Sequence, residues 1–468
     1  MTRRGPNRQL AGLLAESGWS AGELARAVNA LGTKYGLRLR YDRTAVAHWL
    51  EGSRPRPPVP GLVAQVLGRR LGRVVHLGET GLERPAGSGS AADAVLRDGD
   101  PVDRVAALCD TDADPVRRLA LNREMFAATD IRLPSWPSGA EPRTDRPGDT
   151  ARREVPGADP RLADVVTAFA ELTEKYGGAH ARSALGTYIS DDVVPRLRAS
   201  PGAGTSDSEV LTGSACLMHL LGMMLSDAGL PNLGYHCYRS ALELACRADN
   251  RNLYAITLRT MAVLALRLDD LAHARQWSQS ALELAAPTAP LTVRCYLHAG
   301  RAVVRAADGE REGALADLRA AERCHDAEAD ADSGTGTDSG TGTGTEPLGL
   351  FTRYPPAAFR YQRGEVLLWL GDRTRAAVAF QESLAVRPPA HHISRLLTHA
   401  RLAGTLLGLG DLEAALDQCR QACAHYPLTA SRRTTAALTA LRRSLAPYRR
   451  HPLAREVRGH IARLTSRA

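Results

Sequence analysis

The sequence lacks any apolar run long enough to span a bilayer, which takes about 18 residues or more. Its richest stretch, Cys216–Leu225, is ten residues long and is interrupted by His219. This composition predicts a buried core helix rather than a membrane span. The N-terminus, Met1–Pro6, also has no apolar segment of the kind found in secretory signals. We therefore expect a cytoplasmic protein with no membrane partner.

Metal and catalytic motifs are missing as well. The eight cysteines include no Cys-x-x-Cys pair, and Cys419 and Cys423 are spaced like buried apolar groups on a helix. The adjacent His391 and His392 follow two prolines and indicate a helix start rather than an ion site. There is no His-Glu-x-x-His, no nucleophile elbow, and the Gly-Thr repeats of residues 334–345 lack the ending of a phosphate-binding loop. The sequence predicts no metal, no cofactor and no enzyme activity.

Lysine is almost absent, because Lys34 and Lys175 are the only two. Arginine is distributed unevenly: the net charge is +8 over residues 1–85, −8 over residues 86–431 and +9 over residues 432–468. A GC-rich genome explains arginine in place of lysine, but it does not explain basic ends around an acidic middle. Clustered cations bind the phosphates of nucleic acids. The ends are therefore candidate DNA contacts, with general arginine abundance as the alternative.

A short helix with its own start and stop signals is predicted within residues 42–57. Asp42 can cap the first turn through its side-chain oxygen, and Gly52 and Pro55 end the helix. One face holds apolar residues at helical spacing, namely Val46, Trp49 and Leu50. The other face holds small or polar residues that suit a DNA groove, namely Arg43, Thr44, Ala47 and His48. This arrangement predicts a recognition helix.

A partner helix is predicted just before it, over residues 21–29. Ser20 caps this helix, and Glu23 completes a capping box. A first helix and a closing helix flank the two, marked by leucines and valines at helical spacing: Leu10, Leu13, Leu14, Leu62, Val63, Val66, Leu67 and Leu71. Trp19 is a candidate anchor, and the compact unit ends near Leu82.

The motifs Ser-x-x-Glu-Leu-Ala from Ser20 and Val-x-x-Trp-Leu-x-Gly-x-x-Pro from Val46 resemble the Xre-type helix-turn-helix family of bacterial regulators. A turn of about three or four residues is usual in such units, whereas residues 29–41 form an insert here. Alternation of Leu37, Leu39 and Tyr41 with two arginines predicts a short extended arm. The residues expected to face base edges are Arg43, Thr44 and His48. The residues expected on phosphates are Arg38, Arg40, Arg54 and Arg56.

The remaining chain contains a repeat. Turn signatures recur at intervals of 40, 39, 63 and 39 residues, beginning at Gly229, Asp269, Asp308, Gly371 and Gly410. The long interval contains residues 326–349, a low-complexity Gly/Thr/Asp segment that we predict to be disordered. Ser240–Ala245 recurs as Ser280–Ala285. Each repeat is predicted to be a pair of amphipathic helices, which must stack on neighbours to bury its apolar face.

This array resembles the tetratricopeptide repeat family over residues 208–430. The best unit has the family's small, bulky and terminating residues, namely Gly364, Leu367, Ala376, Phe380 and Pro388. The resemblance implies an all-α fold: an N-terminal helix-turn-helix domain followed by a tetratricopeptide-like helical-hairpin superhelix. The predicted divisions are 1–82 for the DNA-binding domain, 83–159 for a linker with short helices and a Pro-rich segment, 160–430 for the α-solenoid and 431–468 for a basic helical cap. The linker is expected to let the two units move independently.

The array has two interpretations. It is either a surface for protein–protein contact or an effector site within its concave face, for a peptide, a small molecule or a protein. Polar residues on the first helix of a pair are the effector candidates, although each is as readily a solvated surface residue: Asn252, Arg259, Arg294, His298 and Arg301. The basic C-terminal region is either a contact for DNA or an acidic partner, or a solvated face.

The combination resembles bacterial regulators that join an Xre-like unit to a tetratricopeptide array, some of which sense peptides. It is similar in particular to the NsdA-type proteins of actinobacteria, described as restraining sporulation and antibiotic production. The resemblance implies a repressor of development or secondary metabolism that binds double-stranded DNA. A homodimer is expected, because two half-sites multiply specificity. The alternative is a scaffold that binds other proteins and no DNA.

Overall fold

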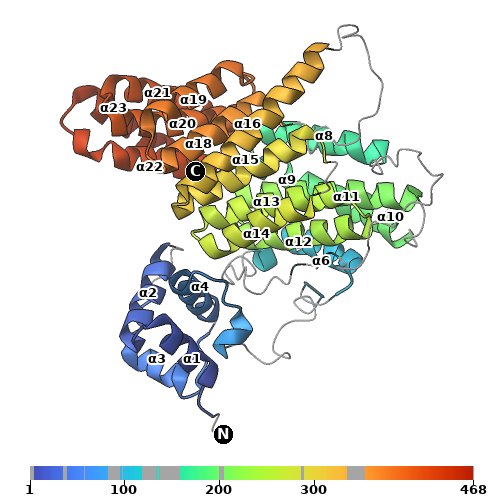
Figure 1. The fold of residues 1–468 in the computed structure, drawn as a ribbon, viewed down its shortest axis with the longest axis vertical. Helices are drawn as coiled ribbons and strands as arrows, with labels where there is room; N and C mark the ends of the chain where they lie inside the picture. Colours follow the sequence, from blue (N-terminus) through green and yellow to red (C-terminus); the bar gives the residue numbers. More distant parts are fainter. Residues whose placement is uncertain are drawn as a thin grey trace.

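The computed structural model describes residues 5–34, 39–56, 58–82, 95–96, 99–118, 133, 136, 159–199, 205–285, 289–334 and 354–466. Within these ranges every regular element is helical, so the predicted all-α fold is confirmed. Figure 1 shows the N-terminal helices as a small bundle on one side of a much larger array of paired helices.

The N-terminal domain consists of α1 (Arg8–Ser17), α2 (Ala21–Lys34), α3 (Arg43–Leu50), α4 (Val59–Leu71) and a final 3-10 turn, η1 (Leu77–Thr80). The predicted caps are present. Asp42 Oδ1 accepts a hydrogen bond from the amide of Ala45 at 2.9 Å. The Ser20 amide donates to Glu23 Oε2 at 2.8 Å, and the Glu23 amide donates to Ser20 Oγ at 3.3 Å. Apolar residues from Leu10 to Leu82 form one core.

Helix α2 is longer than predicted, because it continues past Asn29 to Lys34. Leu31 is buried in the domain core and extends the apolar stripe by another turn. Eight residues therefore separate α2 from α3. Of this connection the structure describes residues 39–42, which are irregular, and Arg38 lies outside the described residues.

The array is a succession of helices that pack in sequential pairs. Its first helices are α6 (Pro101–Ala113), α8 (Pro160–Tyr176), α9 (Gly178–Tyr188), the π-helical η3 (Ile189–Val193) and α10 (Val194–Ala199). Five hairpins follow: α11 (Thr205–Asp227) with α12 (Pro231–Arg247), α13 (Arg251–Arg267) with α14 (Leu271–Leu284), α15 (Leu291–Asp308) with α16 (Arg311–Gly334), α18 (Pro356–Trp369) with α19 (Arg373–Val386), and α20 (His392–Leu409) with α21 (Leu412–His425). A 3-10 turn, η4 (Tyr426–Leu428), leads to α22 (Arg432–Ser444), η5 (Ala446–Tyr448) and α23 (Pro452–Thr465), which form the C-terminal cap.

The predicted turn signatures lie inside these hairpins and explain their sharp bends. Gly371 and Gly410 have φ angles of 84° and 85°, in the left-handed region that glycine enters without strain. The next residue in each case, Asp372 or Asp411, caps the second helix with its side chain. In an earlier hairpin Asp269 takes the glycine position with a φ of 60°, which Asp tolerates better than most residues.

Helix α6 belongs to the core of the array, although it lies within the predicted linker. Val105 and Leu108 are fully buried in the cluster that contains α9 and α12. Buried Arg104 donates to Glu243 on α12 and to the carbonyl of Leu96 at 3.1 Å. The predicted linker includes short helices, and α6 is one of them. Its apolar face is covered by neighbouring helices, so this helix is part of the core rather than of a flexible connection.

The array turns back so that its first and last helices touch. Asp227, the last residue of α11, accepts hydrogen bonds from the Gly178 amide at 2.9 Å and from Ser431 Oγ at 2.7 Å. Nearby, Ser394 Oγ on α20 donates to Glu174 Oε2 on α8 at 2.6 Å. The bonds made by Ser431 and Ser394 join residues more than 200 positions apart in the chain. The superhelix is therefore tied at its two ends.

Two further expectations are decided by the structure. Helix α16 runs to Gly334, so residues 326–334 are helical rather than disordered, and residues 335–349 lie outside the described part. Alanine and glutamate favour helix, and extending a helix that already exists avoids the cost of nucleation. Among the described helices, α11 alone is long and apolar enough to cross a membrane, over Asp207–Asp227, and 78% of the apolar 18-residue window within this span is buried in the structure. It is the core helix that the sequence predicted.

The N-terminal domain contacts the array through α4. Gln65 Nε2 and Arg69 Nη2 donate to the carbonyl of Leu268, which follows α13, at 3.5 and 3.3 Å. Arg275 on α14 donates to the carbonyl of Gly72. Residues 59–68 are all buried, because one side of α4 faces the domain core and another faces the array. The expectation of two units joined only by a flexible linker is thus wrong.

Candidate DNA-binding site

The outward face of α3 is built as the sequence predicts. Val46 and Trp49 are 0% and 4% exposed and anchor the helix to the domain core. The residues that project to solvent on the opposite side are Arg43, Thr44, Ala47 and His48. In Figure 1, α3 lies on the side of the domain away from the array, whereas α4 lies toward it. The face is therefore accessible while the two parts of the chain remain in contact.

The arginines of this domain divide into two groups. Three are used internally: Arg69 bonds the array, Arg70 donates to the Ser17 carbonyl at 3.0 Å, and Arg73 forms ion pairs with Glu16 and Glu79. A second group makes no side-chain hydrogen bond or ion pair within the described part of the chain: Arg8 on α1, Arg26 on α2, and Arg40, Arg43, Arg54 and Arg56 on or beside α3. All of these except half-buried Arg54 are exposed. Their charges are available to a partner outside the chain.

A clamp holds the arm that precedes α3. Asn29 Nδ2 donates to the carbonyl of Tyr41 at 2.7 Å, and the Tyr41 amide donates to Asn29 Oδ1 at 2.9 Å. The Tyr41 ring meets Trp49 edge to face, with centroids 5.1 Å apart. Leu39 and Tyr41 pack on the domain, and Arg40 between them points to solvent. The clamp therefore fixes Arg40 beside the recognition face, and no local pattern in the sequence indicated this role of Asn29.

Acidic groups limit the positive charge of the face. Glu51, 76% exposed, lies 3.5 Å from Nδ1 of His48, which is 64% exposed. Asp42 stands at the opposite end of α3 as its cap. The sugar–phosphate backbone of DNA would therefore have to lie along the side of the face that carries the arginines and away from Glu51 and Asp42.

The five effector candidates all lie on first helices of hairpins, but the structure does not bring them together. On α15, Arg301 binds Asp317 through Nε at 2.8 Å and Nη2 at 2.6 Å, and His298 Nδ1 lies 3.1 Å from the same carboxylate. These two residues therefore hold α15 against α16. Arg294 is exposed, and Asn252 is half-buried. Arg259 is buried and lies on the other side of α15, over the ring of Tyr296.

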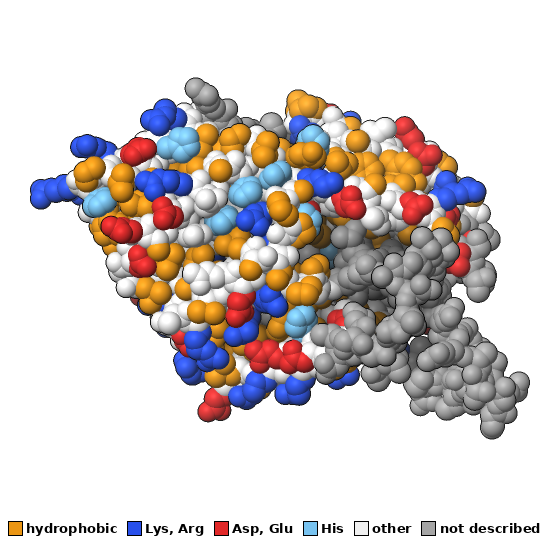
Figure 2. Space-filling model, turned by 90° about the horizontal axis from the view of Figure 1, so that it is seen from above, with side chains coloured by type: hydrophobic (Ala, Val, Ile, Leu, Met, Phe, Trp, Pro, Cys, Tyr) orange, Lys and Arg blue, Asp and Glu red, His pale blue; other side chains and the backbone are white. Residues whose placement is uncertain are grey.

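The C-terminal cap is also strongly basic. Its exposed arginines are Arg432, Arg433, Arg442, Arg443, Arg449, Arg450, Arg455 and Arg463. Figure 2, viewed from the side of the last hairpins, shows blue side chains at the end of the molecule that carries the cap. Figure 1 places the cap at the far end of the molecule from α3. The two basic regions therefore do not form one continuous surface.

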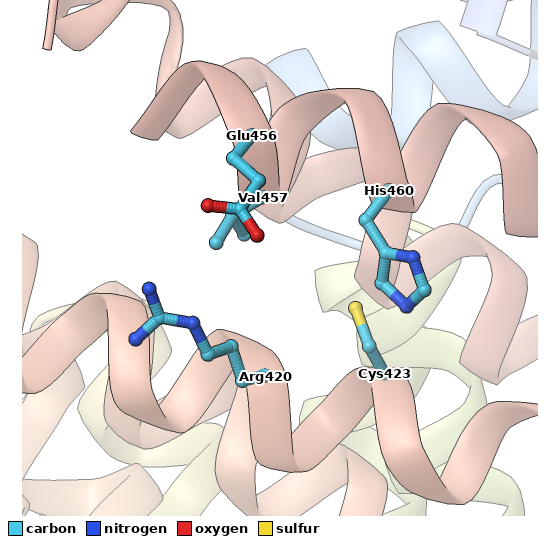
Figure 3. A pocket seen from close by; sticks show the side chains of 5 residues that line it. All are labelled: Arg420, Cys423, Glu456, Val457 and His460. Atoms are coloured by element: carbon cyan, nitrogen blue, oxygen red, sulfur yellow. The ribbon is translucent and has the colours of Figure 1, made fainter. Parts of the chain in front are cut away.

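A small open pocket of about 240 Å³ lies between α21 and α23, which pack against each other beneath it. Its lining side chains face one another across the gap in Figure 3: Arg420, Cys423, Glu456, Val457 and His460. Burial raises the pKa of the Cys423 thiol to about 11, so the thiol stays protonated near neutral pH and is a poor nucleophile. Within the described residues there is no group of three metal-ligating side chains.

The comparisons with known proteins concern the N-terminal domain. The family model of the SP15 N-terminal domain matches residues 10–83. The match falls on the stretch that forms the first hydrophobic core, from Leu10 to Leu82. No curated protein matches the chain.

Proposed function

We propose that the chain is a DNA-binding transcription regulator, in which the N-terminal domain contacts double-stranded DNA through α3 and the array responds to an effector or a partner. The exposed face of Arg43, Thr44, Ala47 and His48, on a short capped helix, carries this proposal. Recognition helices present polar side chains to the major groove while their apolar side anchors the domain. A role in the cytoplasm as a dimeric repressor of development or secondary metabolism remains a prediction from the resemblance.

The unpaired arginines around α3 support the phosphate contacts. An arginine that is exposed and unpaired gains a counter-ion when it meets a phosphate, at little cost to the internal structure. Within the described residues Arg40 and Arg56 are of this kind, and half-buried Arg54 is unpaired as well, in contrast to Arg73, which two carboxylates already hold. Removing one arginine that binds a phosphate should lower the slope of log affinity against log salt by about 0.9.

The test is retardation of genomic DNA fragments by the full chain at several salt concentrations. Arg40→Ala combined with Arg56→Ala should weaken retention, and it should flatten the salt dependence by the amount expected for about two phosphates. The matched control is Arg319→Ala, which removes an exposed arginine from α16 in the array and should leave retention unchanged.

Chromatin immunoprecipitation with sequencing extends the test to the genome. Enrichment at discrete palindromic sites is the expected result for a dimeric regulator. A folded full chain that retains no fragment even in dilute buffer would refute the proposal. The scaffold alternative, in which the array binds other proteins, would then take its place.

A further inference from the structure

Arg259 on α13 is an unusual arginine, because it is buried and has no counter-ion among the residues that the structure describes. The residue is 6% exposed, and neither Nε nor Nη2 has a hydrogen-bond partner among those residues. No carboxylate in the described part of the chain pairs with it. A buried charge without a partner destabilises a folded protein, so a binding role would explain why an arginine occupies this position.

The guanidinium is held in place from two sides. The carbon at its centre lies 3.9 Å from the centroid of the Tyr296 ring, a cation–π contact. On the α15 side the backbone comes very close, at Gly300, where an added Cβ would collide with Nε of Arg259. The glycine therefore provides the space in which the guanidinium lies.

The side chains beneath the guanidinium are neutral and polar. Thr260 Oγ1 lies 3.1 Å from the Tyr296 hydroxyl and 3.5 Å from His219 Nε2, and Thr257 Oγ1 lies 3.0 Å from His219 Nδ1. Burial, together with the charge of Arg259, lowers the pKa of His219 to about 3. The imidazole is therefore neutral and supplies no balancing charge.

The two unpartnered atoms form one edge of the guanidinium, the edge that binds an oxyanion through two parallel hydrogen bonds. The same chain uses this edge on carboxylates elsewhere. Arg301 binds Asp317 through Nε and Nη2, and Arg401 reaches Glu365 with Nε at 2.9 Å and Nη2 at 2.9 Å. We propose that Arg259 is the anchor of a binding site for the carboxylate or phosphate group of a small effector.

Helix α13 connects this site to the N-terminal domain. Nine residues beyond Arg259, the carbonyl of Leu268 accepts hydrogen bonds from Gln65 and Arg69 of α4. At 1.5 Å per residue this separation is roughly 13 Å along one helix. An anion that repositions α13 therefore acts on the contact that holds the DNA-binding domain. This regulatory role rests on the proposed function, whereas anion binding itself does not.

The binding test uses the full chain without DNA. Thermal unfolding is followed while sodium phosphate or sodium acetate replaces sodium chloride at constant ionic strength. At least one of the two oxyanions should raise the unfolding temperature in a saturable way, and the one that does so identifies the chemical group. Arg259→Met should abolish this shift yet unfold at the same or a higher temperature in chloride, because it removes an unpaired buried charge. An arginine with a purely structural role would instead lower the unfolding temperature when it is replaced.

Two further variants keep the test decisive. Gly300→Ala should displace the guanidinium and weaken oxyanion binding tenfold or more even if Arg259→Met does not fold. Arg319→Met, on the exposed face of α16, should keep the full shift. Absence of any shift in the wild-type chain, or the same shift in Arg259→Met, overturns the site. If the oxyanion binds but does not change DNA retention by the wild-type chain, the regulatory role is refuted and the site stands. Failure of the wild-type chain to retain any DNA would instead refute the proposed function.

Discussion

Substitution of Asp227 by Ala should open the junction between the two ends of the array. The Asp227 side chain is 7% exposed and accepts one hydrogen bond from the Gly178 amide and one from Ser431 Oγ. Hydrogen bonds to a charged group contribute about 1.5–3 kcal/mol each. Arg433, 3.8 Å away and 42% exposed, adds little because water screens it. We expect the junction to be destabilised by about 3–6 kcal/mol, the sum for the two hydrogen bonds.

A chain of several cores does not unfold in two states, so the assay must be local. Amide hydrogen exchange of peptides covering Gly178 and Ser431 reports the junction directly. A destabilisation of about 3 kcal/mol corresponds to exchange roughly a hundredfold faster, since about 1.4 kcal/mol is a factor of ten. The control is Asp417→Ala, whose side chain is 69% exposed and pairs with Arg420 one turn away. Exchange at the junction that is as slow in Asp227→Ala as in the control would refute the reasoning.

Two further predictions concern the hairpins. Burial raises the pKa of Asp317, but hydrogen bonds from His298 and Arg301 outweigh it and hold the pKa below its usual value. Asp317 therefore stabilises the chain fully above the ordinary carboxyl range, and this contribution disappears as the pH falls through the lowered pKa. The difference in unfolding temperature between wild type and Asp317→Asn should shrink on acidification, and a difference independent of pH would contradict the assignment. Gly364→Ala would place a Cβ 2.6 Å from a ring carbon of Phe380, and this crowding should lower the free energy of unfolding by about 1–3 kcal/mol. Gly404→Ala is the control, because a Cβ there would have nothing within 4 Å and should not destabilise the chain. Equal unfolding temperatures for the two variants would contradict this prediction.

Much of the N-terminal domain could be predicted because its signals are local. The cap of α3 by Asp42, the capping box at Ser20 and the burial of Trp49 each depend on residues three or four positions apart. The all-round apolar character of residues 59–68 is also present in the sequence. A helix of that kind must be covered on more than one side. This signal indicates that α4 contacts more than its own domain, whereas the prediction of a flexible linker left that contact out.

The role of each charged residue could not be predicted in the same way. His298, Arg301 and Arg259 are alike in the sequence, as polar residues on first helices of hairpins. In the structure the first two meet Asp317 on the next helix, while Arg259 meets an aromatic ring and no carboxylate within the described residues. Their different partners depend on which side of α15 each one faces.

The sequence by itself determined the helices, their caps and the repeat interval, because helix formation and turns depend on neighbours within one or two turns of chain. Only the tertiary structure decided that Asp227 ties the ends of the array, that α4 meets the carbonyl of Leu268, and that Nε and Nη2 of Arg259 are left without a partner in the described part of the chain. The first two pairings join residues that are 204 and 199 positions apart. Whether such distant residues meet depends on the packing angles of all the hairpins between them. No local sequence pattern encodes the combined effect of those angles.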